Sequence, residues 1–188
     1  VPGVTVQADD PPTRCTRSKD NYAHQLARRR GLRLVDVSCS GATTAHILGA
    51  WNELKPQLDA VDVDTLLGTG ISGGYDVRLT ASLGANACRT AGAANCPAAP
   101  APPTAQEWAD LETHLRQIAS EVRGRAPSAR LVFVDDTTVL PADGTCPALS
   151  LTAEQAAADR EINRHVVEIT AKVAGATGSG LVTASAIT

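Results

Sequence analysis

The stretch VDVSCSGATT, residues 35–44, decides the fold of this chain. It overlaps a run rich in β-branched residues, 32–37, that predicts a strand, and it ends in a turn of small residues around Gly41. Thr43 and Thr44 can cap a helix that follows the turn. A strand that ends in a glycine turn and opens a helix presents backbone N–H groups at the carboxyl edge of a sheet, where α/β proteins bind their ligands. The stretch therefore predicts an α/β fold with a ligand site at this edge.

Predicted strands and helices alternate along the rest of the chain. Strands are expected at residues 32–37, 65–69, 129–136 and 181–183. Helices are expected from Ser18 or Asp20 to Arg30, at 43–48, at 51–61 with an interruption at Pro56, at 78–87, at 104–123, and from Thr152 to just before Gly175. This alternation predicts a three-layer α/β/α sandwich with a parallel sheet and right-handed crossovers.

Local signals support several of these elements. Thr104 with Glu107, and Thr152 with Gln155, have the spacing of capping boxes at the starts of two long helices. The apolar run ARLVFVDD, residues 129–136, is typical of a strand buried on both faces of a parallel sheet. The proline-rich segment 97–104 is expected to be a stiff connector within one domain, residues 1–188, because signals of the same α/β type resume directly after it.

Composition excludes several classes of function. The formal net charge is -3, and the one basic run, Arg28 to Arg30, falls in the last turn of a predicted helix, where cations suit the dipole, so we expect no nucleic-acid partner. No apolar stretch approaches the ~20 residues of a membrane span, so no integral membrane segment is expected. The absence of Met predicts a processed or trimmed chain. The five cysteines show no metal-ligand spacing, which favours disulfides and an extracellular setting over a metal site.

Three segments carry a resemblance to a known family. CTRS at residues 15–18, NYAHQLA at 21–27 and SCSGATT at 38–44 resemble the early blocks of secreted SGNH (GDSL-type) lipases and esterases. The resemblance implies an SGNH-hydrolase-like, flavodoxin-like sandwich, secretion, and hydrolysis of lipid-like or small acyl esters without a cofactor. It also implies that Cys15 pairs with Cys39 and Cys88 with Cys96, and that the partner of Cys146 lies beyond the printed sequence.

Members of the SGNH family carry four blocks: a GDS serine, an oxyanion-hole glycine, an oxyanion-hole asparagine in GGND, and an Asp-x-x-His pair. The resemblance places Gly41 at the glycine position and Gly74 and Tyr75 in the third block, with Tyr75 where the family has asparagine. The serine and Asp-x-x-His blocks do not occur in the printed sequence, so we expect a catalytically incomplete chain that lacks the first strand of the family. Sheet edges would then stay unpaired unless another segment, such as residues 1–7, fills the position.

An alternative nucleophile is Ser72, because residues 70–74 read G-x-S-x-G directly after a predicted strand. Asp135 or Asp136 and then His165 would complete the order of a triad. However, His165 falls opposite the apolar stripe of its predicted helix, and we expect it, like His114, to be solvated. His24 also lies off an apolar stripe, and only His46, just past the glycine turn, is expected near the site.

Two further patterns have structural explanations. Gly68, Gly70 and Gly73 spell G-x-G-x-x-G, but the region about 20 residues on offers no strand that ends in an acid, so a tight turn with close helix packing is favoured over dinucleotide binding. Asp135 and Asp136 are expected to point to opposite faces as strand-end residues.

The sequence therefore leaves three functions open. The first is a monomeric, cofactor-free ester hydrolase that is incomplete as printed. The second is a non-catalytic α/β domain that keeps an esterase fold for binding or as a scaffold. The third is a hydrolase centred on Ser72.

Overall fold

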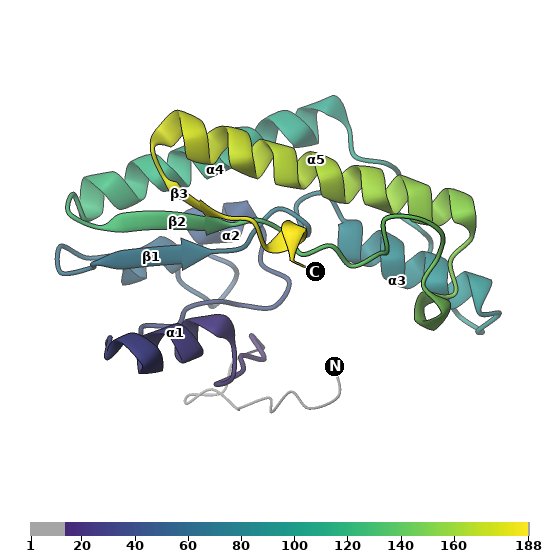
Figure 1. Cartoon of the computed structure of the whole chain (residues 1–188), viewed down its shortest axis with the longest axis horizontal. Helices are drawn as coiled ribbons and strands as arrows, with labels where there is room; N and C mark the ends of the chain where they lie inside the picture. The colour runs from purple at the N-terminus through teal and green to yellow at the C-terminus, as the bar shows by residue number, and fades with distance from the viewer. Residues whose placement is uncertain (1–13, 188) are drawn as a thin grey trace.

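A parallel sheet of three strands forms the centre of the molecule (Figure 1). The structure, a computed structural model, describes residues 14–187. The strands β1 (Leu67–Gly70), β2 (Arg130–Val134) and β3 (Gly180–Val182) lie in the order β1-β2-β3. Leu67 pairs with Arg130, and Val132 pairs with Gly180. Both pairings are parallel, as the alternation of strands and helices predicts.

Helices cover both sides of this sheet. The α-helices are α1 (Tyr22–Arg30), α2 (Thr44–Leu48), α3 (Leu79–Thr90), α4 (Ala105–Arg125) and α5 (Ala153–Thr177). Short 3-10 helices are η1 (Gln57–Ala60), η2 (Pro147–Leu149) and η3 (Ala184–Ala186). In Figure 1, α4 and α5 lie above the sheet and α1 lies below it. The predicted α/β architecture, a parallel sheet with helices on both sides, is confirmed.

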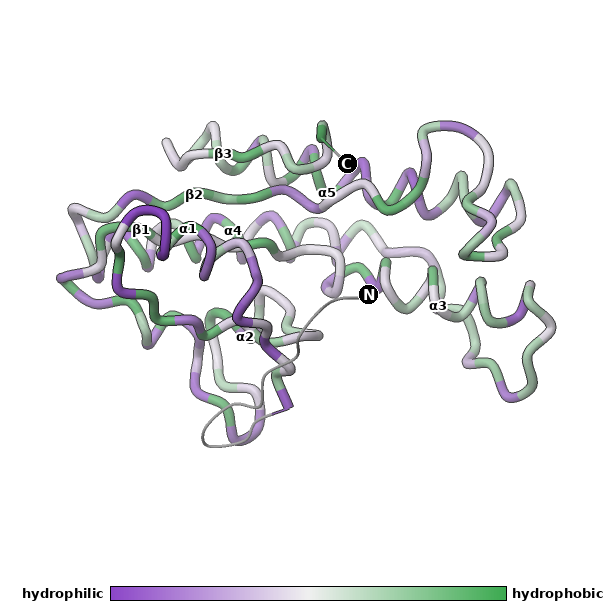
Figure 2. The backbone as a smooth tube through the Cα atoms, turned by 60° about the horizontal axis from the view of Figure 1, so that its bottom comes forward, coloured by the Kyte–Doolittle hydropathy of each residue, from purple (hydrophilic) through white to green (hydrophobic). Residues whose placement is uncertain are grey.

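The main core lies between the sheet and the two long helices. Apolar residues recur at steps of three and four along α4 and α5, so each helix turns one stripe toward the sheet. The buried side chains of this core include Leu111, Leu115, Ile118, Val122, Phe133, Val166, Ile169 and Val173. Figure 2 shows the apolar character of β2 and, in contrast, the polar character of α1. Among the described residues, no helix is both long and apolar enough to cross a membrane.

Several predicted helix ends are confirmed and others shift. Capping boxes begin α4 and α5, at Thr104 and Thr152, as predicted. Asn21, rather than Ser18 or Asp20, caps α1, because its side chain accepts from the backbone N–H of His24. The helix α5 runs past Gly175, where its end was expected, to Thr177, and its C-cap Gly178 adopts the left-handed conformation, with φ 66.

The strand expected at residues 32–37 is wrong. This segment carries no strand assignment, and Val35 is 52% exposed. Side chains instead of a neighbouring strand satisfy part of its backbone: the Arg17 guanidinium donates to the carbonyl of Asp36 at 2.7 Å. The β-branched residues of this segment favour a strand, but in the described part of the chain no neighbouring strand pairs with it, so no strand forms. Residues 1–7, expected as a substitute strand, lie outside the described residues.

The helix expected at residues 51–61 is also largely wrong. Trp51 and Leu54 form an isolated antiparallel bridge, which turns the chain before Pro56. Pro56 lies immediately before η1, the only helical turn in this stretch. Proline lacks a backbone N–H and therefore confines the helix to the residues that follow it.

Both predicted disulfides are present. Cys15 and Cys39 are joined across a separation of 24 residues, and Cys88 and Cys96 across 8 residues. Cys146 is a free thiol. The Cys15–Cys39 disulfide joins the segment before α1 to the turn that precedes α2.

Removing the Cys15–Cys39 bridge with paired serine substitutions is expected to lower the free energy of unfolding by about 3 kcal/mol, because the bridge restricts the unfolded chain. The Cys88–Cys96 bridge closes a shorter loop, so its removal by the matched pair of serine substitutions should lower the free energy of unfolding by less. Urea unfolding of the two double variants measures both values. A larger loss from the shorter loop would contradict the loop-entropy explanation.

Candidate active site

A pocket of 330 Å³ lies where the carboxyl ends of β1 and β2 meet the turn that precedes α2. Its walls come from segments far apart in the sequence: the turn, the loop after β1, α3, the loop after β2, and α5. The lining residues include Ser38, Cys39, Ala42, Ile71, Ser72, Gly73, Gly74, Tyr75, Leu79, Thr80, Leu83, Asp136, Thr137, Val139 and Asn163. The pocket borders the predicted Gly41 turn, but the strands whose carboxyl ends it adjoins are β1 and β2 and not the strand expected at residues 32–37.

The structure brings most of the predicted site residues to this pocket. Ser72, Gly74 and Tyr75 line it together, and the Tyr75 side chain is 44% exposed. Gly41 does not line the pocket, although its neighbour Ala42 does. Gly41 has a φ of 85, and a Cβ there would lie 3.4 Å from the Trp51 ring. The glycine therefore allows a positive-φ turn that packs against an aromatic ring.

Glycine at position 73 is required by close packing. Gly73 has a φ of 138, and a Cβ at this position would lie 2.6 Å from Cγ1 of Val166 on α5. The glycine-rich loop after β1 thus lets α5 approach the pocket floor. This supports the structural explanation of the G-x-G-x-x-G pattern over a cradle for pyrophosphate.

A buried network connects this loop to α2 and α4. The carboxylate of Asp76 accepts from the Thr44 backbone N–H at 3.1 Å and also from the Thr44 hydroxyl. The Thr44 oxygen lies 2.9 Å from Nδ1 of His114, and because its own proton goes to Asp76, His114 is the donor. Burial raises the pKa of Asp76, while the Thr44 hydrogen bonds and His114 oppose this rise. The network fixes the start of α2 against the pocket loop.

The expected positions of the histidines are partly wrong. His114 was expected to be solvated, but α2 packs on its face of α4 and gives it Thr44 as a partner. His165 stacks on Trp108, with ring centroids 4.1 Å apart, and is half-buried instead of solvated. His24 contacts Asn21 and Asp36 near α1. Within residues 14–187, no histidine lines the 330 Å³ pocket.

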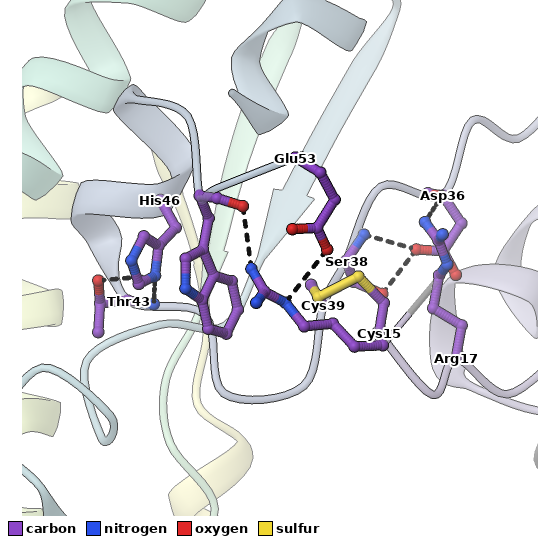
Figure 3. Close-up of a disulfide and its surroundings, with 10 residues drawn as sticks. Cys15, Arg17, Asp36, Ser38, Cys39, Thr43, His46 and Glu53 are labelled. Carbon is purple, nitrogen blue, oxygen red and sulfur yellow. Dashed lines mark hydrogen bonds and ion pairs between the residues drawn. A yellow bond between two sulfur atoms is a disulfide. The ribbon is translucent and has the colours of Figure 1, made fainter. Parts of the chain in front are cut away.

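His46 instead borders a second pocket, of 290 Å³, beside the Cys15–Cys39 disulfide (Figure 3). Its ring stacks on Trp51 with centroids 4.2 Å apart, and the Arg14 guanidinium lies 4.1 Å from the Trp51 ring centroid. His46 also accepts from the Thr43 backbone N–H and so caps α2. None of the predicted oxyanion or nucleophile residues lines this second pocket.

Asp135 and Asp136 point to different environments, as predicted for adjacent strand-end residues. Asp135 is buried and accepts from the backbone N–H and the hydroxyl of Ser185, both at 2.8 Å. Asp136 lines the pocket, and its Oδ2 is buried without a hydrogen-bond partner. The sequence did not predict that Asp136 lines the pocket, because the alternation along a strand shows only that the two acids face opposite sides of the sheet.

The electrostatic environment of Asp136 is unfavourable to its charged form. Burial raises the pKa of Asp136, and repulsion from Asp135 and Asp76 adds to this rise, whereas the backbone N–H of Gly74 lowers it. A Cβ at Gly74 would lie 3.0 Å from Oδ2 of Asp136. The carboxyl group of Asp136 therefore lies directly beside a predicted oxyanion donor.

Asp136→Asn is expected to stabilise the fold at neutral and higher pH. Because the pKa of Asp136 is raised in the folded state, its stabilising contribution is present below the unfolded value of 3.8 and is lost as pH rises through the folded value. The variant should gain about 1 kcal/mol near pH 8 and nothing at acid pH. Urea unfolding of the variant and the parent protein across this pH range measures the difference in their free energies of unfolding. Asp76 and Asp159 are present in both proteins, so their contributions cancel in this difference. A difference that does not change with pH would contradict the prediction.

The family follows from the comparison with known proteins. A model of the GDSL-like lipase/acylhydrolase family matches residues 3–186. The chain belongs to this family. The resemblance seen in the three early segments is thereby confirmed over almost the whole length of this GDSL-like chain.

Relatives and solved structures agree with this assignment. Lipase 2 of Streptomyces coelicolor is 32% identical over 185 residues, which cover 92% of this chain and 62% of that lipase. The phospholipase A1 of Streptomyces albidoflavus NA297 superposes with a TM-score of 0.74 at 23% identity, covering 98% of this chain and 75% of that one. An extracellular lipase of Streptomyces rimosus gives 0.71 at 23% identity, covering 95% and 74%. The solved structures share the fold, and this GDSL-like chain spans about three fifths of Lipase 2.

Proposed function

We propose that this chain takes part in the hydrolysis of carboxylic esters of lipid-like or small acyl type, outside the cell and without a cofactor. The observation that carries the proposal is the 330 Å³ pocket, in which Ser72, Gly74 and Tyr75 meet the SCSGATT turn. Membership of the GDSL-like family, the relation to Lipase 2 and the two disulfides support it.

The proposed roles follow from the chemistry of acyl transfer. The tetrahedral intermediate carries a negative oxygen, which hydrogen-bond donors stabilise. We assign the backbone N–H group of Gly74 and the phenol of Tyr75, which line the pocket, to this task. The family resemblance adds the backbone N–H of Gly41, which does not itself line the pocket but adjoins Ala42, which does. The apolar side chains of Ile71, Leu83 and Val139 offer a wall for the acyl chain.

Ser72 is the candidate nucleophile within the described residues. Its Oγ is buried and has no hydrogen-bond partner. A serine attacks an ester efficiently only when a base takes its proton. Because no histidine among residues 14–187 lines the pocket, Ser72 would depend on a base that reaches it in the substrate complex.

The second candidate function is a non-catalytic binding domain. The unpartnered Ser72 hydroxyl favours it, and so does the Asp136 carboxyl beside the Gly74 N–H, because a carboxylate there opposes an oxyanion at the same donor.

The test uses the 188-residue chain with p-nitrophenyl butyrate and palmitate, followed by a fluorophosphonate probe and intact-mass analysis. Ester turnover with an adduct that maps to Ser72 and disappears in Ser72→Ala is the expected result. Ser120→Ala, at an exposed position on α4, is the matched control. The absence of both ester turnover and a probe adduct would contradict the proposal for this chain and favour the binding function.

Tyr75→Phe provides a test of the oxyanion role. Removing one oxyanion donor costs about 100-fold in kcat, so a loss of that size with little change in KM is expected. Because Tyr75 is exposed, the variant is expected to fold as the parent protein does, and a thermal melt checks this. An unchanged kcat would remove Tyr75 from the oxyanion site.

A further inference from the structure

The second pocket, of 290 Å³, carries positive charge on its walls. Two cationic side chains, Arg17 and Lys55, line it together with one carboxylate, Asp59. These three side chains leave the lining with one net positive charge, in a chain whose formal net charge is -3. The pocket is therefore a local exception to the acidic character of the chain.

The protein itself compensates little of this charge. Within residues 14–187, the Lys55 ammonium has neither a hydrogen bond nor an ion pair. Arg17 donates from one guanidinium nitrogen to the carbonyl of Asp36, and a guanidinium carries five N–H donors in all. Asp59 already faces a cation, because the Arg125 guanidinium lies 3.3 Å from its carboxylate. An anionic ligand would therefore meet cations whose charge is not neutralised by Asp59.

The aromatic wall of the second pocket has no open ring face (Figure 3). The His46 ring stacks on Trp51 at 4.2 Å, and the Arg14 guanidinium lies 4.1 Å from the centroid of the same ring. Two groups at these distances cannot share one face, so they cover both. Glu53, 3.8 Å from Arg14, offsets the charge of that guanidinium, and His46 is neutral because its Nδ1 accepts from the Thr43 N–H. A quaternary ammonium group, which needs an open aromatic face, therefore finds no site here.

The rest of the lining is largely apolar. Val37, Leu54, Pro56 and Ala60 contribute hydrocarbon surface, and the Cys15–Cys39 disulfide adds its sulfur atoms. Ligand pockets commonly measure about 300–1,000 Å³, so this one lies at the small end of the range. The walls thus suit a short hydrocarbon chain that ends in an anionic group.

The two pockets are neighbours of opposite electrostatic character. Cys39 and Gln57 line both of them. The 330 Å³ pocket contains Asp136, and the nearby Asp76 and Asp135 raise the pKa of its carboxyl group by repulsion. An anion is therefore disfavoured in the 330 Å³ pocket and favoured in the second pocket beside it.

We propose that the second pocket binds a short-chain aliphatic carboxylate, with Lys55 and Arg17 at the carboxylate and the apolar wall around the chain. The planar guanidinium fork matches the two oxygens of a carboxylate. A lining with one net positive charge suits a monoanion better than a phosphate monoester, which carries a charge of about −1.5 to −2 at neutral pH. The inference goes beyond the proposed function, because no residue that was assigned to ester hydrolysis lines this pocket.

The test uses the two tryptophans as reporters. Trp51 lines the second pocket, whereas Trp108 stacks on His165 and does not line it. Hexanoate is titrated into the ¹⁵N-labelled 188-residue chain at neutral pH, and NMR follows the two indole N–H signals, which Trp108→Phe assigns. We expect a saturable shift of the Trp51 signal alone. The affinity for hexanoate should be at least about tenfold higher than for 1-hexanol, acetate or hexylammonium, and it should fall as salt is added.

Variants assign the effect to the two cations. Lys55→Ala should weaken hexanoate binding by about fivefold and Lys55→Glu by about twentyfold, whereas Lys55→Arg should retain it. Arg17→Gln should also cost about fivefold, and a thermal melt checks its folding because Arg17 contacts the backbone. The binding of 1-hexanol should not change in the Lys55 variants. Lys19→Ala and Arg33→Ala, at exposed positions outside the pocket, are the matched controls.

Several results would overturn the inference. Equal affinities for hexanoate and 1-hexanol would show an apolar cavity without an anion site. Tighter binding of hexyl phosphate than of hexanoate would show a phosphate site, and a hexanoate shift confined to the amides of Gly74 and Tyr75 would place the ligand in the 330 Å³ pocket. Hexanoate binding without ester turnover would support the inference and contradict only the proposed hydrolase. Ester turnover without a shift of the Trp51 signal would contradict the inference alone.

Discussion

Replacing Gly73 with alanine is expected to lower the free energy of unfolding by about 4 kcal/mol. The backbone φ of 138 is strained for any residue with a side chain, and the added Cβ would lie 2.6 Å from Cγ1 of Val166. Val166 is fully buried on α5, where a β-branched side chain has one strongly preferred rotamer, so it cannot turn away. Backbone strain and overpacking each cost about 1–3 kcal/mol, which gives the expected sum.

Urea unfolding of Gly73→Ala, beside Gly70→Ala, measures this effect. Gly70 lies at the end of β1, a Cβ there would have no heavy atom within 4 Å, and its φ lies outside the positive region, so its variant should lose less than about 1 kcal/mol. Combining Gly73→Ala with Val166→Ala should give a smaller loss than the sum of the single changes, because the second change removes the clash. Equal losses for the two glycine variants would contradict the packing argument.

Asp76→Ala is expected to destabilise the protein by about 3 kcal/mol. Thr44 has no exposed surface, so the change leaves its backbone N–H and its hydroxyl buried without their acceptor. The Thr44–His114 hydrogen bond loses the group that orients it. Since Thr44 begins α2, the loss also frees this helix from the pocket loop.

Asp76→Asn separates the hydrogen bonds from the charge. The amide oxygen still accepts from Thr44, and the raised pKa of Asp76, caused mainly by burial, means that removing the charge relieves an unfavourable state. Its loss should therefore be well below that of Asp76→Ala in thermal and urea unfolding. Asp64→Ala, at an exposed position before β1, serves as the control for removal of an acid. A loss from Asp76→Asn as large as that from Asp76→Ala would show that the charge, not the acceptor, matters.

The sequence predicts those features that depend on near neighbours along the chain. The capping boxes at Thr104 and Thr152 and the apolar run that becomes β2 need only local spacing, and all are confirmed. The pairings Cys15–Cys39 and Cys88–Cys96 came from the family resemblance and are also confirmed. The capping boxes and the apolar run locate α4, α5 and β2 without knowledge of distant contacts.

Features that depend on distant partners could not be predicted in the same way. Residues 32–37 have strand composition, but a strand forms only with a neighbour to pair with. His114 lies on the polar face of α4, and only the packing of α2 on that face gives it a buried partner. The sequence also could not decide which of Asp135 and Asp136 faces the pocket, since a slip of one residue exchanges the two faces of a strand.

The helix α5 links the pocket to the main core of the molecule. Val166 packs against Gly73 of the pocket loop and belongs to the main core, and Asn163, one turn earlier, lines the pocket itself. A movement of α5 that widens the pocket must therefore break core packing, which resists small displacements. The α5 wall of the pocket thus has the stiffness of the core, and ligands must fit the fixed shape of that wall. Substitutions that enlarge it for bulkier substrates would trade thermal stability for breadth of specificity.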